Sequence, residues 1–179
     1  MPTITNIIPN VNNSLFYWLN TITYTKNSIT GKISSHFPGI NILLGFPSAL
    51  EALKLPSISL VENSILPQSN EVFGEYRKMI TFPFTIWGFA GSKDDDGKNK
   101  YERDTLKNDL RFLLEKTYFI NIYDFPESLE PDFNTVSTDV EIMNIKTYNI
   151  PITGTNKVDR YRFAVDFDLL YYWNIDLTW

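Results

Sequence analysis

Cysteine is absent from this sequence, and His36 is its only histidine. Disulfide bonds and thiolate metal sites are therefore excluded, and the usual zinc-ligand sets are disfavoured. No apolar run reaches the roughly 18 residues that span a bilayer, so we expect no membrane segment. The first twenty residues also lack the basic segment and the small-residue cleavage site of a secretory signal. A reducing, intracellular place of assembly fits these absences.

Acidic residues are missing from positions 1–50, where the only charged side chains are Lys26 and Lys32. Residues 51–179 hold all 21 acids and the other 14 bases, so net charges of +2 and −7 make up the overall −5. An acidic balance without a basic patch argues against binding nucleic acid through its phosphates. The acidic charge is compatible with a protein that encloses DNA without binding it, because like charges keep DNA from adhering to the wall of a channel.

The length and composition indicate one globular domain. The chain has 179 residues, of which 43% are hydrophobic and 15% aromatic, and this is too apolar for a disordered protein. Leucines at 106, 110, 113 and 114 have the spacing of a core-facing stripe and predict a helix over 100–117. Asn99 and Glu102 resemble a capping box at its start.

Alternation of apolar and polar residues predicts most of the strands. Ile80, Phe82, Phe84 and Ile86 indicate a strand over 79–87, and Pro83 within it favours an edge strand or a bulge. The sequence therefore predicts an α+β fold with one mostly antiparallel mixed sheet and the 100–117 helix packed on one face. We expect this domain over residues 51–179, preceded by an N-terminal extension at 1–50 with a short helix and a loop. The remaining expected strands are 57–62, 119–123, 136–150 and 161–173.

The last predicted strand is unusually long. Thirteen residues at roughly 3.3 Å each span about 40 Å, whereas a typical strand has about 5–6 residues. One small domain rarely provides a core of that width, so part of the strand is expected to pack on a neighbouring subunit. Its aromatic side chains are assigned to the core or to a subunit interface: Phe163, Phe167, Tyr171 and Trp173.

The densest charge run includes Asp94, Asp95 and Asp96. A calcium loop with Gly97 at its sixth position would need a glutamate at the twelfth, where Arg103 stands. The favoured interpretation is a solvated loop before a helix, where negative charge is mildly stabilised. Arg103, Lys107 and Arg111 are spaced along the outer face of that helix. They form either a docking ridge for an acidic partner or an ordinary solvated face.

No catalytic, metal or cofactor site is predicted. Pro131 and Asp132 match the first half of a nuclease pattern, but Glu141 is not followed by the required x-Lys. A G-x-S-x-G elbow and a phosphate-binding GxxxxGK[ST] loop are both absent. His36 lies in a Ser/Gly/Pro-rich segment and is interpreted as a polar residue on the surface.

Four segments together resemble the tail terminator, or tail-completion, proteins of long-tailed bacteriophages. They are PSISLVE at 56–62, EYRKMITFPFTIWGF at 75–89, ERDTLKNDLRFLLEK at 102–116 and DRYRFAVDFDLLYY at 159–172. The similarity is one of pattern, covers roughly residues 50–175 and includes no catalytic motif.

This resemblance implies a structural virion protein, assembled in the host cytoplasm. Such a protein forms a homo-oligomeric ring, usually a hexamer, that caps the tail tube and meets the head–tail connector or stopper protein. DNA passes through the lumen without specific binding. Residues 1–50 would clamp a neighbouring subunit, the sheath or the connector. The loop of Asp94, Asp95 and Asp96 would then face the lumen or an adjoining ring and become ordered only on assembly.

Other functions stay open at this point. Within the same class, the protein could be another neck, baseplate or tube-associated ring component. Outside it, the alternatives are a binding module for a partner protein and, less favoured, a metal-dependent enzyme using scattered carboxylates.

Overall fold

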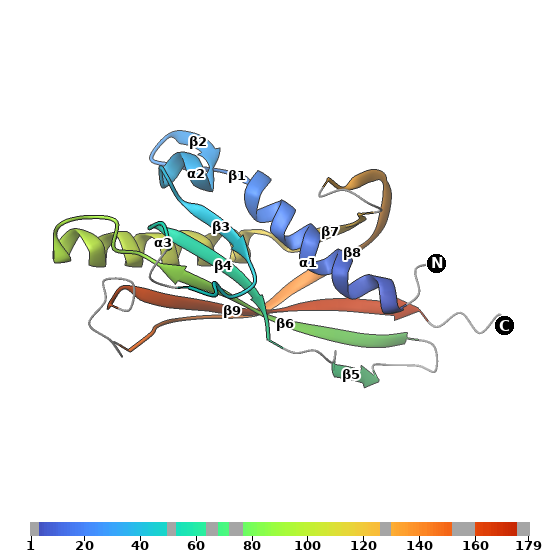
Figure 1. The fold of residues 1–179 in the computed structure, drawn as a ribbon. Coiled ribbons are helices and arrows are strands. Elements are labelled where there is room, and N and C mark those ends of the chain that lie inside the picture. The colour runs from blue at the N-terminus through green and yellow to red at the C-terminus, as the bar shows by residue number, and fades with distance from the viewer. Residues whose placement is uncertain are drawn as a thin grey trace.

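The computed structural model describes residues 4–49, 53–63, 68–71, 77–125, 130–151 and 160–174. These residues form an α+β fold of helices and a seven-stranded, mostly antiparallel sheet (Figure 1). In chain order the elements are α1 Ile4–Thr21, β1 Thr23–Lys26, β2 Ile29–Lys32, α2 Ile33–His36, β3 Asn41–Leu44, β4 Ser57–Glu62, β5 Gln68–Glu71, β6 Arg77–Phe89, α3 Asp96–Lys116, β7 Phe119–Asp124, β8 Asp132–Asn149 and β9 Arg162–Asn174.

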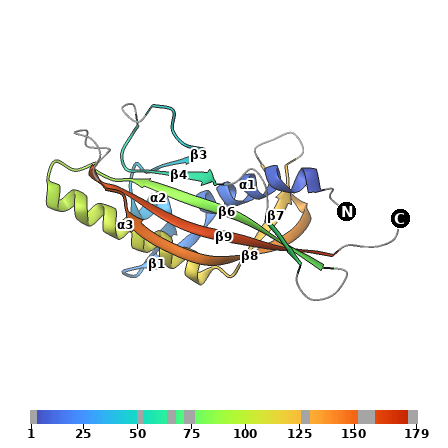
Figure 2. The same ribbon diagram turned by 90° about the horizontal axis from the view of Figure 1, so that it is seen from below.

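The sheet follows the order β3-β4-β6-β9-β8-β7, and β5 pairs with β6 where β4 no longer reaches it. β3 runs parallel to β4, whereas the other strand pairs are antiparallel. β1 and β2 form a separate hairpin. β6 and β9 pair over thirteen residues, and they run side by side along the length of the molecule (Figure 2).

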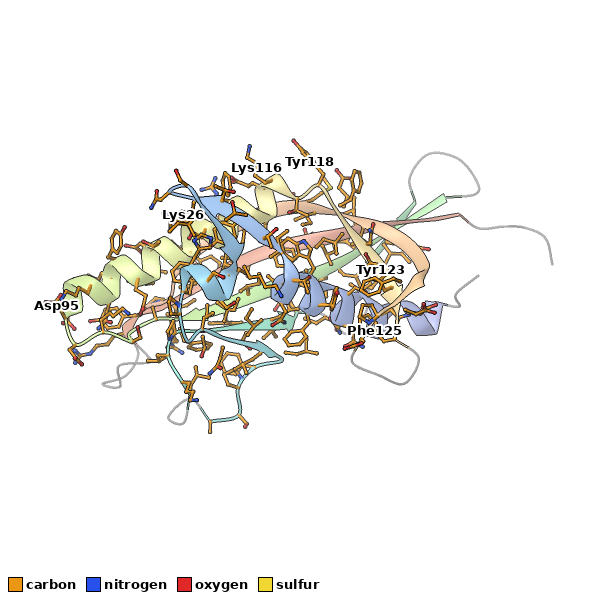
Figure 3. The ribbon with its side chains drawn as sticks, turned by 90° about the horizontal axis from the view of Figure 1, so that it is seen from above. Lys26, Asp95, Lys116, Tyr118, Tyr123 and Phe125 are labelled. Carbon is orange, nitrogen blue, oxygen red and sulfur yellow. The ribbon has the colours of Figure 1, made fainter. Side chains whose placement is uncertain are left out.

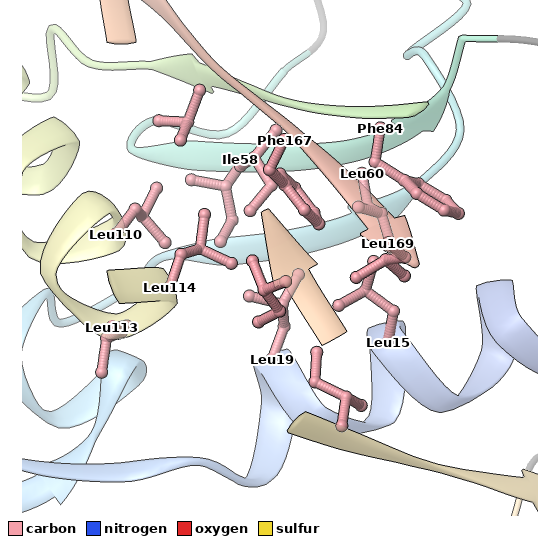
Figure 4. Close-up of a cluster of buried hydrophobic side chains, with 14 of the residues drawn as sticks. Leu15, Leu19, Ile58, Leu60, Phe84, Leu110, Leu113, Leu114, Phe167 and Leu169 are labelled. Atoms are coloured by element: carbon pink, nitrogen blue, oxygen red, sulfur yellow. The ribbon is translucent and has the colours of Figure 1, made fainter. Parts of the chain in front are cut away.

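Both long helices contact the sheet and contribute leucines to one core. Phe84 lies opposite Phe167 in the β6–β9 register, and their rings stack with centroids 5.9 Å apart. Leu15 and Leu19 of α1 meet this layer together with Leu110 of α3 (Figure 4). A buried leucine of this kind contributes about 1.5–3 kcal/mol through the hydrophobic effect. The leucine stripe predicted for α3 is therefore confirmed as a core-facing surface.

Residues 4–49 are part of the same core and sheet. Val11, Leu15 and Leu19 are almost fully buried, and β3 extends the sheet by pairing with β4. The expected division at residue 50 is therefore not observed, because an amphipathic helix with a wide apolar face must cover a sheet. The short helix expected within residues 1–50 is α1, which has 18 residues, and part of the expected loop is the β1–β2 hairpin followed by α2.

β9 lies in the middle of the sheet, between β6 and β8. Phe163, Phe167 and Tyr171 are buried by the chain itself. The side chain of Trp173 lies outside the described residues. β9 is therefore covered within its own chain at Phe163, Phe167 and Tyr171, because β6 and β8 flank it and α1 and α3 supply apolar side chains above it. At these residues the expected packing on a neighbouring subunit is not needed.

Pro83 lies in the middle of β6, although proline has no N–H to donate to a neighbouring strand. β6 is a central strand, so the expected edge position is wrong for the strand as a whole. On one side, however, β5 pairs with residues 78–81 and β4 with residues 84–89, which leaves Pro83 between them. Its carbonyl accepts from the Asn63 N–H at 2.9 Å. The missing N–H therefore removes no ladder bond.

The opposite side of the sheet carries a polar network. Thr85 donates to Asp166 at 2.5 Å and accepts from Asn63 at 2.6 Å. The Tyr148 hydroxyl donates to the other oxygen of Asp166 at 2.8 Å. Burial and this hydrogen bond raise the pKa of Tyr148. The second face is therefore polar over its middle, in contrast to the apolar face under the helices.

Candidate functional site

The three aspartates do not form one loop. The Asp95 carboxylate accepts from the Lys98 N–H at 2.9 Å and caps α3, which begins at Asp96 and not near residue 100. Asp96 accepts a hydrogen bond from the Tyr161 hydroxyl, and this bond raises the pKa of that tyrosine. Asp94 is exposed. Asp95 and Asp96 therefore have partners within the chain, and ordering of this segment on assembly stays a prediction.

Asn99 and Glu102 have a tertiary role in place of the expected capping box. The Glu102 carboxylate accepts from the N–H groups of Gly91 and Ser92, at 2.9 and 3.0 Å, and from the Ser92 hydroxyl. Burial favours the neutral acid, but these bonds and Lys93 together lower the pKa of Glu102. Asn99 bonds the backbone of Lys93 twice, at 2.8 and 3.0 Å. The turn between β6 and α3 is therefore fixed to the helix.

The proposed basic ridge on α3 is largely neutralised. Arg103 and Lys107 both bind Asp104, at 2.9 and 3.4 Å, and Lys107 also donates to Asn149. The hydrogen bond from Arg103 is the main influence that lowers the pKa of Asp104. Arg111 pairs with Glu115 at 2.7 Å. These contacts agree with the ordinary solvated face and leave little free positive charge for an acidic partner.

A cleft of about 480 Å³ lies between the first half of α3 and the segment from β1 to α2. We call it the α3 cleft. Phe37 contributes a buried apolar wall, and Tyr101 projects from α3 with most of its surface exposed. Lys26, Lys93 and Lys98 also line it. The volume falls in the range of about 300–1,000 Å³ that is typical of ligand pockets. Figure 3 shows Lys26 in the β1–β2 hairpin and Asp95 at the start of α3.

The lysines of the α3 cleft differ in how they are paired. Lys26 forms a 2.7 Å ion pair with Asp109, whereas Lys93 lies 3.8 Å from Glu102 with more than half of its side chain exposed. Lys98 is exposed at the mouth of the cleft. The lining therefore has a net positive charge on a protein with a net charge of −5.

His36 stabilises the wall of this cleft. Its ring packs on Tyr24 with centroids 4.1 Å apart, and its Nε2 lies 3.3 Å from the Tyr24 carbonyl oxygen. Burial and the neighbouring Asp109 raise the pKa of Tyr24, so that its hydroxyl stays protonated. His36 is therefore half-buried against this tyrosine, in contrast to the exposed polar residue expected from the sequence.

Three large aromatic side chains are exposed where α3 leads into β7. They are Phe112, Tyr118 and Phe119, with 48%, 72% and 58% of their surface accessible, and we call them the β7 edge patch. Lys116 lies over the Phe112 ring at 5.6 Å, and Figure 3 shows it beside Tyr118. Leaving apolar groups of this size in water is unfavourable, and clustered exposed aromatics mark interaction surfaces.

The β7 edge patch borders a sheet edge. Among the described strands, only β8 pairs with β7. The Ile142 N–H donates to the Tyr118 carbonyl, so the antiparallel alternation directs the backbone groups of Phe119 and Asn121 away from β8. The next outward N–H, that of Tyr123, is occupied by Ser14 of α1 at 2.9 Å. The open part of the edge is therefore short and lies beside the aromatic side chains.

Sequence reasoning missed both surfaces. Tyr101, Tyr118 and Phe119 occur in ordinary amphipathic patterns that do not reveal which face is covered. The α3 cleft brings together segments near residues 26–38, 56 and 93–105, whose proximity follows only from the fold. The residue pair Asn27-Ser28 was a local signal for the turn between β1 and β2, beside the cleft. Both residues have positive φ values, 51° and 67°, as a two-residue hairpin turn requires.

Among the residues that the structure describes, no group of three or more His, Cys, Asp or Glu side chains is arranged to hold a metal ion. No helix of the described residues is both long and apolar enough to cross a bilayer. No protein-family model matches the sequence, and a search of curated proteins finds no match.

Proposed function

We propose that this protein is a structural virion component of a long-tailed bacteriophage, which forms a ring, caps the tail tube and joins the tail to the head connector. The observation that carries the proposal is the β7 edge patch beside an open sheet edge. A second copy that covers these aromatic side chains removes them from water, and it can also pair with the exposed backbone groups.

A ring follows from this kind of contact if it is repeated. β7 is an outer strand, and the opposite edge of the sheet is formed by β3, which differs from it in sequence and pairing. An edge that binds a different surface of the next copy makes a head-to-tail contact, and such contacts close into a ring when the rotation per subunit permits. The four resembling segments favour the ring of a tail terminator among the assemblies that such contacts build.

The acidic composition is consistent with a lumen that carries DNA. A net charge of −5 disfavours adhesion to phosphates, so DNA would pass without specific binding. The partners proposed for the two faces of the ring are the tail tube protein and the connector or stopper protein. The sheath is a third proposed contact.

Cryo-electron microscopy of virions tests the function directly. The proposal expects density for this chain as a closed ring between the last ring of the tail tube and the connector. Density elsewhere in the particle, or a single copy per particle, would overturn it. Light scattering of the purified chain with isolated tail tubes adds a solution measurement, because free subunits of such rings can stay monomeric until they meet the tube.

Two matched variants test the role of the β7 edge patch in assembly. Phe119→Glu places a charge in the patch, and the protein should assemble at least about tenfold less readily on tubes. Met143→Glu makes the same kind of change at an exposed apolar residue of β8. The control should assemble like the wild type. Equal assembly of both variants would show that the contact lies on another surface.

A further inference from the structure

We propose that the α3 cleft binds a small phosphate monoester that carries a flat ring, which is the chemistry of a nucleoside monophosphate. This inference goes beyond the proposed ring of subunits and does not depend on it. Three properties of the cleft carry it: the lining offers hydrogen-bond donors, it has an excess of positive charge, and much of its surface is apolar or aromatic.

The cleft offers donors to a ligand and has no carboxylate free to repel one. Among the described residues, the Lys98 ammonium forms no ion pair, and the hydroxyls of Ser35 and Thr105 form no hydrogen bond. The carboxylate in the lining belongs to Glu102, and it already accepts from the N–H groups of Gly91 and Ser92 and from the Ser92 hydroxyl. An anion is therefore the ligand that these groups can satisfy.

The charge of the lining fits a dianion. Three lysines line the cleft against one glutamate. Lys26 is held by Asp109 at 2.7 Å, whereas Lys93 reaches Glu102 only at 3.8 Å and Lys98 is exposed. Two ammonium groups are therefore left for a ligand. A phosphate monoester has a charge of about −1.5 to −2 at pH 7 and three acceptor oxygens, and it matches two ammonium groups better than a single carboxylate does.

The apolar part of the lining fits a flat ring. Phe37 is buried in one wall, beside Pro38 and Pro56, and Tyr101 stands on α3 with 74% of its surface accessible. A planar ring that enters between α3 and the segment after α2 can stack on the Tyr101 ring. Stacking of this kind tolerates different bases, because every base has a π-face.

A nucleic-acid strand is disfavoured by the surroundings of the cleft. Asp94 and Asp95 are exposed next to Lys93, and the whole chain is acidic. The neighbouring phosphates of a strand would be held against these carboxylates, whereas a single phosphate can approach the lysines without meeting them. The cleft therefore favours a small molecule over a polymer of the same chemistry.

Isothermal titration calorimetry with the full-length protein and adenosine monophosphate tests this site. Two smaller probes divide the ligand, since adenosine lacks the phosphate and inorganic phosphate lacks the ring. We expect saturable binding of the monophosphate. Each smaller probe should bind at least about tenfold more weakly, because it loses one of the two groups that the cleft contacts. Binding should also weaken as salt is raised, since Lys93 and Lys98 are exposed.

Two pairs of variants assign the binding to this cleft. Tyr101→Ala should weaken binding at least about fivefold, because it removes the stacking ring. Its control is Tyr118→Ala, since Tyr118 is 72% accessible and does not line the cleft. Lys98→Glu should weaken binding about five- to tenfold, whereas Lys100→Glu, on the same helix and outside the lining, should bind like the wild type. All four positions are exposed, so the variants should melt close to the wild type.

Absence of saturable binding, equal affinity for either smaller probe, or equal effects of a variant and its control would each overturn the inference. Tighter binding of a short oligothymidine than of thymidine monophosphate would overturn it in favour of a nucleic-acid strand. None of these outcomes bears on the ring of subunits, which is tested by the position of the chain in virions.

Discussion

Removal of the Glu102 carboxylate gives a direct test of how the β6–α3 turn is fixed. In the wild-type protein this carboxylate accepts from the N–H groups of Gly91 and Ser92 and from the Ser92 hydroxyl. Glu102→Ala leaves the Gly91 N–H without its acceptor in a buried position, whereas the exposed Ser92 can bond to water. A buried donor without a partner costs about 1–3 kcal/mol, and the loss of a hydrogen bond to a charged group costs about 1.5–3 kcal/mol.

These terms overlap, so the expected loss in free energy of unfolding is about 2–4 kcal/mol. For a chain of this size, each kcal/mol lowers the melting temperature by about 2–4 °C, so Glu102→Ala should melt about 4–16 °C below the wild type. Glu115→Gln is the control on the same helix. It breaks an exposed pair with Arg111, and such pairs contribute about 0–1 kcal/mol. Calorimetry at pH 7 measures both changes.

The pH dependence separates the charge of Glu102 from its packing. Its pKa is lower in the folded protein than the usual 4.5, so the ionised carboxylate stabilises the fold at pH values above 4.5. That contribution is lost as the pH falls through the folded pKa. Glu102→Gln cannot titrate, and its deficit relative to the wild type should therefore shrink below about pH 4.5. A deficit that stays constant with pH, or a Glu102→Ala variant as stable as Glu115→Gln, would refute this account.

Two further substitutions test the packing of β6 and the cap of α3. Gly88→Ala places a Cβ 1.9 Å from the Phe163 ring, so denaturant unfolding should show a loss of about 1–3 kcal/mol or more, and adding Phe163→Leu should recover part of it. Asp95→Ala removes the α3 cap and should cost about 0.5–2 kcal/mol by the same measurement, whereas Asp94→Ala, at an exposed position, should stay within about 0.5 kcal/mol.

The spacing of apolar residues predicted which helices and strands form better than it predicted where they begin and end. The leucine stripe of α3 and the alternating residues of β6 and β9 are buried as expected, because burial of one face is what these patterns record. The start of α3 was misplaced because Asn99 and Glu102 have capping-box spacing. Both residues instead bind the turn at 91–93, and a contact of this kind is set by the approach of the chain from β6.

Strand order could not be obtained from the same patterns. Thr85 pairs with Asp166 across 81 residues of chain, and no local signal specifies that β9 follows β6 in the sheet. The α3 cleft and the β7 edge patch depend on that order, so neither was predicted. The length of β9 indicated only how far the sheet extends along its strands. It carried no information on whether the strand is central or at an edge.

Because β9 is central and β7 lies at the edge, we expect substitutions in the two strands to have opposite effects. A core substitution in β9 should lower stability and spare assembly, whereas a substitution at the β7 edge should impair assembly and have little effect on stability. Phe167 is buried in the core, so Phe167→Ala should lower the free energy of unfolding by about 3–5 kcal/mol. The molecules that remain folded should still assemble, because their β7 edge is unchanged. Phe119 is largely exposed but lies opposite Glu141, so Phe119→Glu should lower the free energy of unfolding by only about 1 kcal/mol or less while impairing assembly. Denaturant unfolding and light scattering on the same samples measure both quantities. If Phe167→Ala impairs assembly more than its folded fraction explains, while Phe119→Glu assembles normally, the contact between copies involves the core strands and not the β7 edge.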